Sequence, residues 1–132
     1  MLVAQQLRCL GGGGRVVSCE LDAATAAVAR ILFAWAGVAT EVEMRAGRAM
    51  DWASAGKLGH IDVLILDHRG SRYHEDLLAT EYCLARGARV LADNVLTPGA
   101  PLLLAAMDER YQVTIHEVDE FLRPGRTDWL VV

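Results

Sequence analysis

The sequence predicts an α/β fold built on a mostly parallel sheet. Apolar runs typical of strands alternate along the chain with segments that have the 3.6-residue spacing of helices. Strands that alternate with helices form parallel sheets with helices on both faces. Residues 61–66, in which four apolar residues follow Asp62 in a row, are predicted to form a strand buried on both faces, and the run ends at Asp67. Ligands of such sheets bind outside the carboxyl ends of the strands, so Asp67 marks the expected functional edge.

Composition limits what the chain can be. Its 132 residues, 53% of them hydrophobic, suit a single domain, residues 1–132, with a substantial core. A net charge of −4 argues against nucleic acid or an anionic membrane surface as the main partner. No apolar run reaches the roughly 20 residues of a membrane span. The three cysteines form no CxxC pair, which favours reduced thiols and a cytoplasmic location over disulfides or zinc.

The first half of the chain shows two strands and three helices. The four glycines at 11–14 do not stand between a strand and a helix in a G-x-G-x-x-G pattern, so we interpret them as a flexible turn. Asp22 is expected to cap the helix that follows it. The predicted elements are a helix over 1–10, a strand over 15–19 that ends at Glu20, a helix over 23–37, a strand over 41–46 and a weak helix over 48–57.

The second half continues the alternation and closes with two strands in succession. Pro101 can start a helix, and the segment 123–126 has the composition of a hairpin turn. The predicted elements are the strand over 61–66, an amphipathic helix over 73–86, a strand over 88–92, a loop over 95–99, a helix over 101–107 and strand-like runs over 111–117 and 127–132. The closing hairpin would add an antiparallel edge to the parallel sheet.

Polar residues follow two successive strands at the point where each ends. Asp67 and His68 follow the strand over 61–66, and Asp93 and Asn94 follow the strand over 88–92. Two neighbouring strands would bring three oxygen donors, Asp67, Asp93 and Asn94, to one edge, which suits Mg²⁺. Strand ends are often acidic and Asp-Asn pairs often form turns, so an ordinary structural role stays open.

Glu20 is a second candidate at a strand end. An acidic residue after the second strand of a nucleotide-binding fold can accept hydrogen bonds from both ribose hydroxyls. An ordinary solvated carboxylate at a strand end is the alternative, and position alone does not decide between them.

Two motifs give the sequence a family resemblance. Leu66-Asp67-His68 followed by Arg72-Tyr73, together with Leu91-Ala92-Asp93-Asn94-Val95 and Pro98-Gly99, resembles the catechol O-methyltransferases from about residue 3 onward. The resemblance implies a Rossmann-like class I methyltransferase fold, S-adenosyl-L-methionine and Mg²⁺ as cofactors, and a small catechol-type substrate.

The resemblance also implies roles for individual residues. Asp67, Asp93 and Asn94 match the family's metal ligands, and Asp67 and Asn94 carry the catalytic roles. Glu20 and Leu21 match the cofactor-ribose position, and Asp67 and His68 lie where the family contacts the cofactor. Pro98 matches a proline of the catechol slot, and either Asp119 or Glu120 matches a glutamate that binds a catechol hydroxyl.

Three departures from the family accompany these matches. Gly70 stands where the family has a lysine base, and Arg69 where it has a tryptophan of the substrate slot. The family's first strand and Gly-rich loop would precede Met1, so we expect the sheet to lack them. The strands over 15–19 and 61–66 would then lack their shared neighbour. The chain is expected to be a fragment of a longer protein, or to pair these two strands directly, or to pair their edges with another chain.

Two further functions compete with methyl transfer. A catalytically inactive relic could bind a metal ion or a protein partner through its free sheet edges. A phosphoacceptor-like signalling domain would also use a strand-end aspartate beside a second acidic pair. The signalling domain ranks last, because the lysine expected after its fifth strand is missing and Glu20 would have no role in it.

Overall fold

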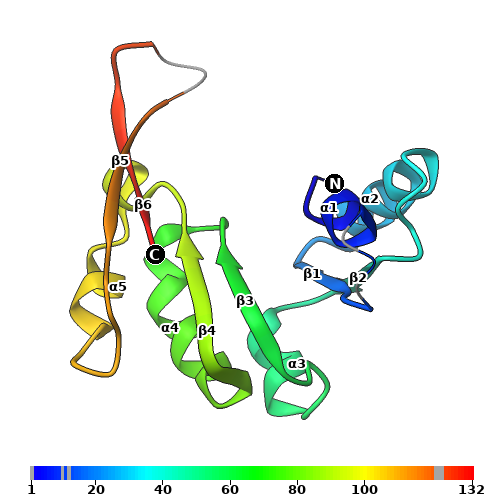
Figure 1. The fold of residues 1–132 in the computed structure, drawn as a ribbon, viewed down its shortest axis with the longest axis horizontal. Helices are drawn as coiled ribbons and strands as arrows, with labels where there is room; N and C mark the ends of the chain where they lie inside the picture. The colour runs from blue at the N-terminus through cyan, green and yellow to red at the C-terminus, as the bar shows by residue number, and fades with distance from the viewer. Residues whose placement is uncertain (1, 10, 12, 121–123) are drawn as a thin grey trace. The chain divides into compact units, whose positions relative to one another are not determined.

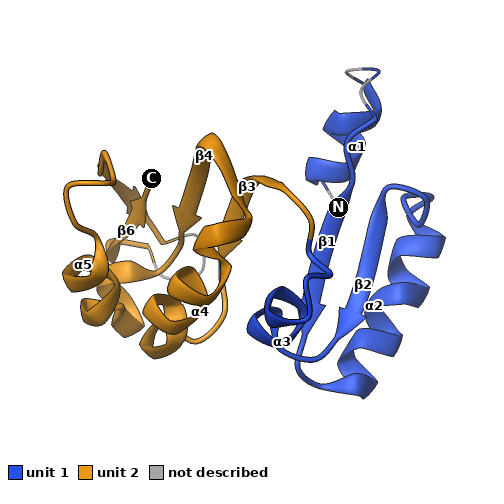
Figure 2. Ribbon diagram, turned by 90° about the horizontal axis from the view of Figure 1, so that it is seen from below, with its two compact units in different colours: residues 1–58 blue, residues 59–132 orange. Residues whose placement is uncertain are grey.

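The computed structural model describes residues 2–9, 11, 13–120 and 124–132. It divides the chain into two compact units, residues 1–58 and 59–132 (Figure 2). The single domain that we expected from the chain length stays a prediction.

The first unit contains a two-stranded parallel sheet and three helices. Val16 lies opposite Val42, and Glu20 opposite Ala46. Asp22 caps its helix as predicted, because its carboxylate accepts a hydrogen bond of 2.6 Å from the Thr25 amide. Met1, Leu10 and Gly12, which belong to the predicted first helix and turn, lie outside the described residues. The elements are α1 (Leu2–Cys9), β1 (Val16–Glu20), α2 (Ala23–Trp35), β2 (Val42–Ala46) and α3 (Ala49–Ser54).

The second unit holds a four-stranded mixed sheet in the order β3-β4-β6-β5 (Figure 1). The pair β3–β4 is parallel, and β6 lies antiparallel to both β4 and β5. The expected closing hairpin is thus confirmed, although residue 123 of its turn lies outside the described residues. The elements are β3 (Ile61–Leu66), α4 (Tyr73–Thr80), β4 (Leu84–Ala92), α5 (Pro101–Ala106), β5 (Ile115–Asp119) and β6 (Thr127–Val131).

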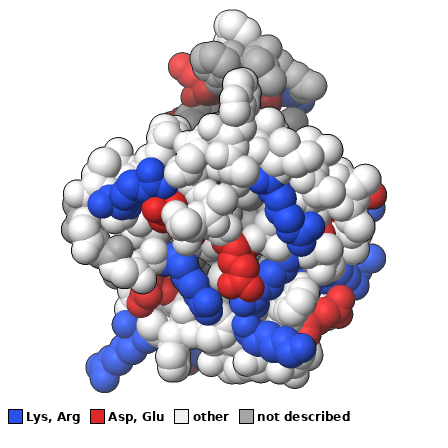
Figure 3. Space-filling view, turned by 90° about the vertical axis from the view of Figure 1, so that its right-hand side faces the viewer, with Lys and Arg blue, Asp and Glu red and all other residues white. Residues whose placement is uncertain are grey.

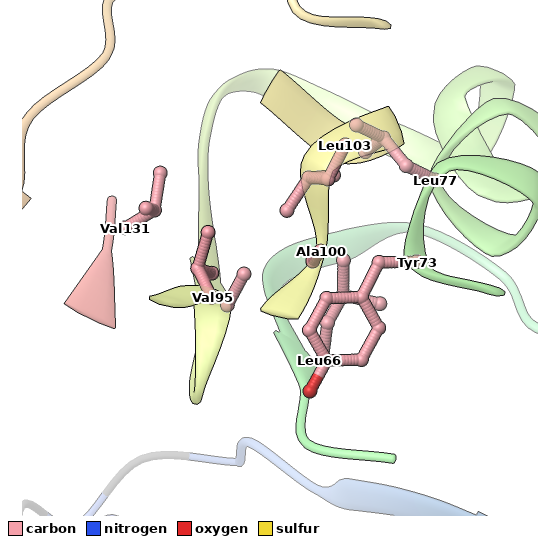
Figure 4. Close-up of a cluster of buried hydrophobic side chains, with 8 residues drawn as sticks. Leu66, Tyr73, Leu77, Val95, Ala100, Leu103 and Val131 are labelled. Atoms are coloured by element: carbon pink, nitrogen blue, oxygen red, sulfur yellow. The ribbon is translucent and has the colours of Figure 1, made fainter. Parts of the chain in front are cut away.

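The core of this unit lies where α4 and α5 pack against the sheet (Figure 4). Burying a side chain such as leucine stabilises a fold by about 1.5–3 kcal/mol. Since the same cluster holds the ends of β3 and β4, it fixes the edge where Asp67 and Asp93 emerge. The buried members of the cluster are Leu66, Tyr73, Leu77, Ala92, Val95, Ala100, Leu103 and Val131.

The helix predicted over 73–86 is too long. The α-helix α4 ends at Thr80, a 3₁₀ turn follows over Glu81–Cys83, and β4 begins at Leu84 rather than at residue 88. Thr80 is buried, and its hydroxyl donates a 2.7 Å hydrogen bond to the Asp76 carbonyl. Leu84 pairs with Ile61 of β3. Strand pairing therefore overrides the helical spacing of this segment.

The prediction that the strand over 61–66 is buried on both faces is wrong. Val63 is 55% exposed and Ile65 is 52% exposed, whereas Leu66 is buried. Successive side chains of a strand point to opposite faces, and the buried cluster lies on only one of them. In its sheet β3 is an edge strand, which agrees with the expected free edge.

The strand predicted over 111–117 lies a few residues later in the structure, at Ile115–Asp119. Its position is fixed by β6, because Ile115 lies opposite Val131 and Asp119 opposite Thr127. The Thr114 amide and carbonyl also exchange hydrogen bonds with Val132. The partner strand, rather than the local apolar pattern, sets where β5 begins.

The surface agrees with the modest net charge of the chain. On the face shown in Figure 3, Lys and Arg are interspersed with Asp and Glu among uncharged residues. Within the described part of the chain, no helix is both long and apolar enough to cross a bilayer. Within the described residues, Cys9, Cys19 and Cys83 form no disulfide.

Candidate functional site

Two aspartates leave the second sheet at the same edge. Leu66 at the end of β3 lies opposite Ala92 at the end of the parallel strand β4. The Asp93 amide donates a 3.0 Å hydrogen bond to the Leu66 carbonyl, which extends the pairing by one residue. The convergence of Asp67 and Asp93 that the sequence predicts is therefore present, because parallel strands in register must end on the same side.

The two carboxylates influence each other across a shared cavity of about 230 Å³. Partial burial raises the pKa of Asp67, and the negative charge of Asp93 raises it further, while His68 lowers it. A cation placed between the carboxylates would relieve this repulsion. The cavity is otherwise apolar, and its lining is Ile65, Asp67, Leu91, Asp93, Val118 and Leu130.

Asn94 follows Asp93 in a left-handed conformation with φ of 53°. Asparagine tolerates this conformation better than most residues. Its amide nitrogen Nδ2 donates a 3.1 Å hydrogen bond to Oδ2 of Asp128. The amide NH₂ group is thereby used, and the carbonyl oxygen Oδ1 is the end of the side chain that can serve as a ligand.

Asp128 is a buried residue of the site that our sequence reasoning missed. It lies on β6, 34 residues from Asn94, and is 1% exposed. Its Oδ1 accepts hydrogen bonds from the Leu96, Thr97 and Trp129 amides at 3.1, 3.2 and 2.7 Å. Burial opposes ionisation, but the hydrogen bonds from Trp129, Asn94, Thr97 and Leu96 outweigh it and lower the pKa of Asp128. A single acidic residue directly before the apolar residues of β6 was the available sequence signal.

His68 is held by two neighbours. Its Nε2 lies 2.7 Å from Oδ2 of Asp76, a buried residue of α4. Its ring also meets the Tyr73 ring edge to face, with centroids 4.8 Å apart. The Tyr73 hydroxyl donates to the Asp93 carbonyl at 3.1 Å. Burial and the charges of Asp67 and Asp93 raise the pKa of Tyr73 to about 12. His68 thus lies beside the carboxylate pair in a defined orientation.

Gly70 allows the loop after β3 to pack directly on the turn after β4. A Cβ atom at Gly70 would lie 2.5 Å from the Gly99 carbonyl oxygen and 3.3 Å from Cβ of Ala100. The position where the resemblance implies a lysine therefore has no room for any side chain here. Pro98, in the same irregular turn over Val95–Gly99, is exposed and follows a cis peptide bond.

The two candidates for the substrate-binding acid lie at the end of β5. Asp119 is exposed, whereas Glu120 is partly buried and its amide donates to the Arg126 carbonyl at 2.8 Å. Val118 lines the cavity with Asp67 and Asp93. Asp119 is the last residue of β5 and Glu120 follows it, and the lining of the cavity includes neither of them.

Glu20 and Leu21 belong to the first unit, at the end of β1. The Glu20 carboxylate accepts a 2.9 Å hydrogen bond from the Asp22 amide, which holds it in the turn that starts α2. Leu21 is 72% exposed. Both residues lie at a strand end, as the sequence predicts, and their role toward a ribose stays a prediction.

Within the described ranges, no group of three or more His, Cys, Asp and Glu side chains is arranged to hold a metal ion. The predicted set of donors contains only two carboxylates, and its third member is an amide. A larger cavity of about 430 Å³ lies at the other end of β4. Its charged residues include Arg110, whose guanidinium pairs with Glu81 at 2.7 Å, and it holds none of the predicted site residues.

Known proteins resemble the chain in sequence. It is 35% identical over 100 residues to catechol O-methyltransferase B of Danio rerio, covering 71% of the chain and 38% of that protein. It is 39% identical over 118 residues to the transmembrane O-methyltransferase of Homo sapiens, covering 83% of the chain and 40% of that protein. The chain thus spans about two fifths of the length of these relatives. No protein-family model matches it.

Solved structures resemble the fold. A cofactor-bound protein from MTB superposes with a TM-score of 0.82 at 24% identity, covering 98% of the chain and 65% of that protein. An O-methyltransferase from Bacillus cereus in complex with SAH gives a TM-score of 0.77 at 21% identity, covering 91% of the chain and 62% of that protein. The predicted Rossmann-like methyltransferase fold is confirmed.

Proposed function

We propose that this chain, a sequence relative of the catechol O-methyltransferases with a Rossmann-like methyltransferase fold, takes part in O-methylation of a catechol-type substrate. S-adenosyl-L-methionine would be the methyl donor and Mg²⁺ the metal. The observation that carries the proposal is the pair of aspartates at the adjacent ends of β3 and β4, opening onto one cavity.

The residues at this edge fit a hard divalent cation. Asp67 and Asp93 supply two carboxylates, and the raised pKa of Asp67, caused by burial and by Asp93, indicates uncompensated negative charge. Asn94 adds an amide oxygen, because its NH₂ group is bound to Asp128. Oxygen donors of this kind are the ones that Mg²⁺ prefers. Bound here, the ion would supply Lewis-acid activation of the acceptor hydroxyl.

The residues proposed for the methyl donor are Glu20, Leu21, Asp67 and His68. Glu20 fits a ribose, since its carboxylate is held at the carboxyl end of a parallel strand. His68 presents an imidazole whose orientation is set by Asp76 and Tyr73. Bound, S-adenosyl-L-methionine would supply the transferable methyl group.

The proposed acceptor is an aromatic ring with two adjacent hydroxyls. Of the two acids near the end of β5, we favour Glu120 over Asp119, because Glu120 is partly buried whereas Asp119 is exposed. Pro98 would border the ring from the turn after Asn94. Since Gly70 has no side chain, the acceptor proton would pass to water or to His68. The loss of a general base typically costs about 10²–10⁴ in rate, so we expect slow turnover.

The direct test measures binding and turnover on the full chain. Calorimetry would follow Mg²⁺, S-adenosyl-L-methionine and catechol, and a labelled methyl group would report transfer. We expect transfer that chelation abolishes and that Asp93→Asn lowers at least 100-fold, whereas Asp62→Asn, an exposed strand residue, leaves it unchanged. Binding of metal and catechol without transfer would support the non-catalytic alternative. Absence of S-adenosyl-L-methionine, metal and catechol binding would refute the proposed methyl transfer and favour a relic that binds a protein partner.

Self-association is a further part of the proposal. Within the described residues, β3 ends its sheet on one side, and its exposed Val63 and Ile65 flank that edge. An apolar edge strand presents free N–H and C=O groups to another chain. Sedimentation at increasing concentration should show a dimer that Ile65→Lys weakens. A monomer at all concentrations would contradict this expectation.

A further inference from the structure

Asp128 makes one hydrogen bond that is not needed to hold the backbone of the turn after β4, the one to the side chain of Asn94. Three backbone amides, those of Leu96, Thr97 and Trp129, donate to its Oδ1 and hold the turn after β4. Its second oxygen, Oδ2, accepts only from the side chain of Asn94 among its hydrogen bonds within the described residues. The two oxygens therefore have separate partners, one the backbone of the turn and the other a single amide.

The second contact decides which end of the Asn94 amide is available. An asparagine amide can present either its NH₂ group or its carbonyl oxygen to a neighbour, and the two orientations have almost the same shape. A carboxylate accepts hydrogen bonds at both oxygens and donates none. Asp128 is buried, so water does not compete for Oδ2. Only the orientation with NH₂ toward Asp128 makes a hydrogen bond.

We propose that Asp128 is a positioning residue that fixes the amide of Asn94, so that its carbonyl oxygen rather than its NH₂ group is available to a cation held by Asp67 and Asp93. This inference rests on the proposed function for the identity of the ligand. It goes beyond that function by naming the residue that orients Asn94 so that its carbonyl oxygen can serve as a metal ligand. With the opposite orientation, an NH₂ group would face the cation and repel it.

The substitution Asp128→Asn separates the orientation of the Asn94 amide from the hydrogen bonds that hold the backbone of the turn. Its carbonyl oxygen can still accept from the three backbone amides, which keeps the turn in place. Its new NH₂ group would face the NH₂ group of Asn94, and two donors cannot bond to each other. The Asn94 amide is then expected to flip and accept from residue 128, turning its own NH₂ group toward the cation site.

The double variant Asn94→Asp with Asp128→Asn should restore the site. The new aspartate at position 94 accepts from the NH₂ group at position 128 and keeps its second oxygen for the cation. The net charge equals that of the wild type, and aspartate also tolerates the left-handed conformation. Rescue by exchanging the two side chains is not expected if Asp128 acts only on the backbone.

The test uses Mn²⁺ as the probe, because it shares the oxygen preference of Mg²⁺ and its binding is read from water-proton relaxation. We expect Asp128→Asn to weaken Mn²⁺ binding at least about 10-fold, as for other residues that orient a metal ligand. The double variant should return to near wild-type affinity, and Asp62→Asn serves as the matched control. Unchanged Mn²⁺ affinity in Asp128→Asn, or no rescue in the double variant, would overturn the inference.

A second measurement needs no metal. In the metal-free wild type, the NMR signals of the Asn94 NH₂ protons should exchange slowly with water, and in Asp128→Asn they should exchange fast. The Leu96 and Thr97 amides should stay protected in both proteins, which shows that the turn is intact. Fast exchange in the wild type would overturn the inference. Slow exchange in a wild type that binds no Mn²⁺ would support the orientation and refute the metal part of the proposed function.

Discussion

Replacing Gly70 by alanine should destabilise the second unit, because this glycine lies against the backbone of another loop. The added Cβ would lie 2.5 Å from the Gly99 carbonyl oxygen and 3.1 Å from its carbonyl carbon. Both atoms belong to the backbone and cannot rotate away as a side chain could. Gly70 itself is buried, so the loop cannot move outward without exposing the residues beneath it.

The expected cost is about 1–3 kcal/mol, the usual range for extra methyl groups in packed interiors. For a chain of this size the melting temperature would fall by roughly 3–15 °C. Circular dichroism would measure the melting temperature, and relaxation by Mn²⁺ would report whether the turn after Asn94 has moved. We expect weaker Mn²⁺ binding as well, because the same turn carries Asn94 at its start.

The matched control is Gly13→Ala, which adds the same methyl group where no atom lies within 4 Å and φ is not left-handed. It should be neutral, or stabilising by about 0.4–1 kcal/mol through the unfolded chain. If Gly70→Ala melted at the same temperature as Gly13→Ala, the close approach of the two loops would be refuted. Gly70→Lys should likewise unfold more easily and fail to supply a base.

Three further changes test the core and the site. Leu103→Ala should cost about 2–5 kcal/mol in urea denaturation, because Leu103 is fully buried between α5 and the sheet. Tyr73→Phe removes the hydrogen bond to the Asp93 carbonyl, which should lower the free energy of unfolding by about 0.5–1.5 kcal/mol. In a pH titration, the same substitution should remove the tyrosinate absorbance of Tyr73, which rises only near pH 12. Asp67→Asn should raise the melting temperature of the metal-free chain at pH 7 while abolishing Mn²⁺ binding. Burial and the charge of Asp93 raise the pKa of Asp67 in the folded chain above its unfolded value, so ionised Asp67 lowers the stability of the folded chain. This loss of stability disappears as the pH falls through the folded pKa. Equal melting temperatures of Asp67→Asn and the wild type at pH 7 would contradict this reasoning.

The meeting of Asp67 and Asp93 was predictable because it depends on two robust signals. Apolar runs of strand length mark β3 and the later part of β4, and a helix is the usual crossover between two parallel strands. Parallel strands in register end together, so the residue after each strand must emerge at the same edge. No side-chain detail was needed for that conclusion.

The wrong boundaries arose where a partner strand overrides local spacing. Residues 73–86 have apolar positions at helical spacing throughout, yet Leu84 pairs with Ile61 and turns the last part into a strand. The exposed face of β3 was missed for a related reason, since a continuous apolar run does not reveal which of its faces is covered. Both outcomes depend on contacts between segments that lie far apart in the sequence.

Asp128 could not be assigned from spacing, because three of its four hydrogen-bond partners lie more than 30 residues away. Its only local mark is that it directly precedes the apolar residues of a predicted strand. A buried charge in a strand requires compensation. Four N–H donors supply that compensation, and they lower the pKa of Asp128 although burial opposes ionisation. An acidic residue inside a predicted core strand should therefore prompt a search for donors at the nearest strand ends.

Charge at this edge of the sheet is distributed unevenly, and that distribution favours a cation at one place. The charges of Asp67, Asp93 and Asp128 all raise the pKa of Tyr73, so all three act on the same region. Asp128 is saturated by backbone and amide donors, whereas Asp67 has a raised pKa and opens onto a cavity with Asp93. A mobile cation would therefore gain most between Asp67 and Asp93, where charge is least compensated. Of the four hydrogen bonds that Asp128 accepts, the one from the Asn94 amide would leave the carbonyl oxygen of Asn94 available as the third metal ligand.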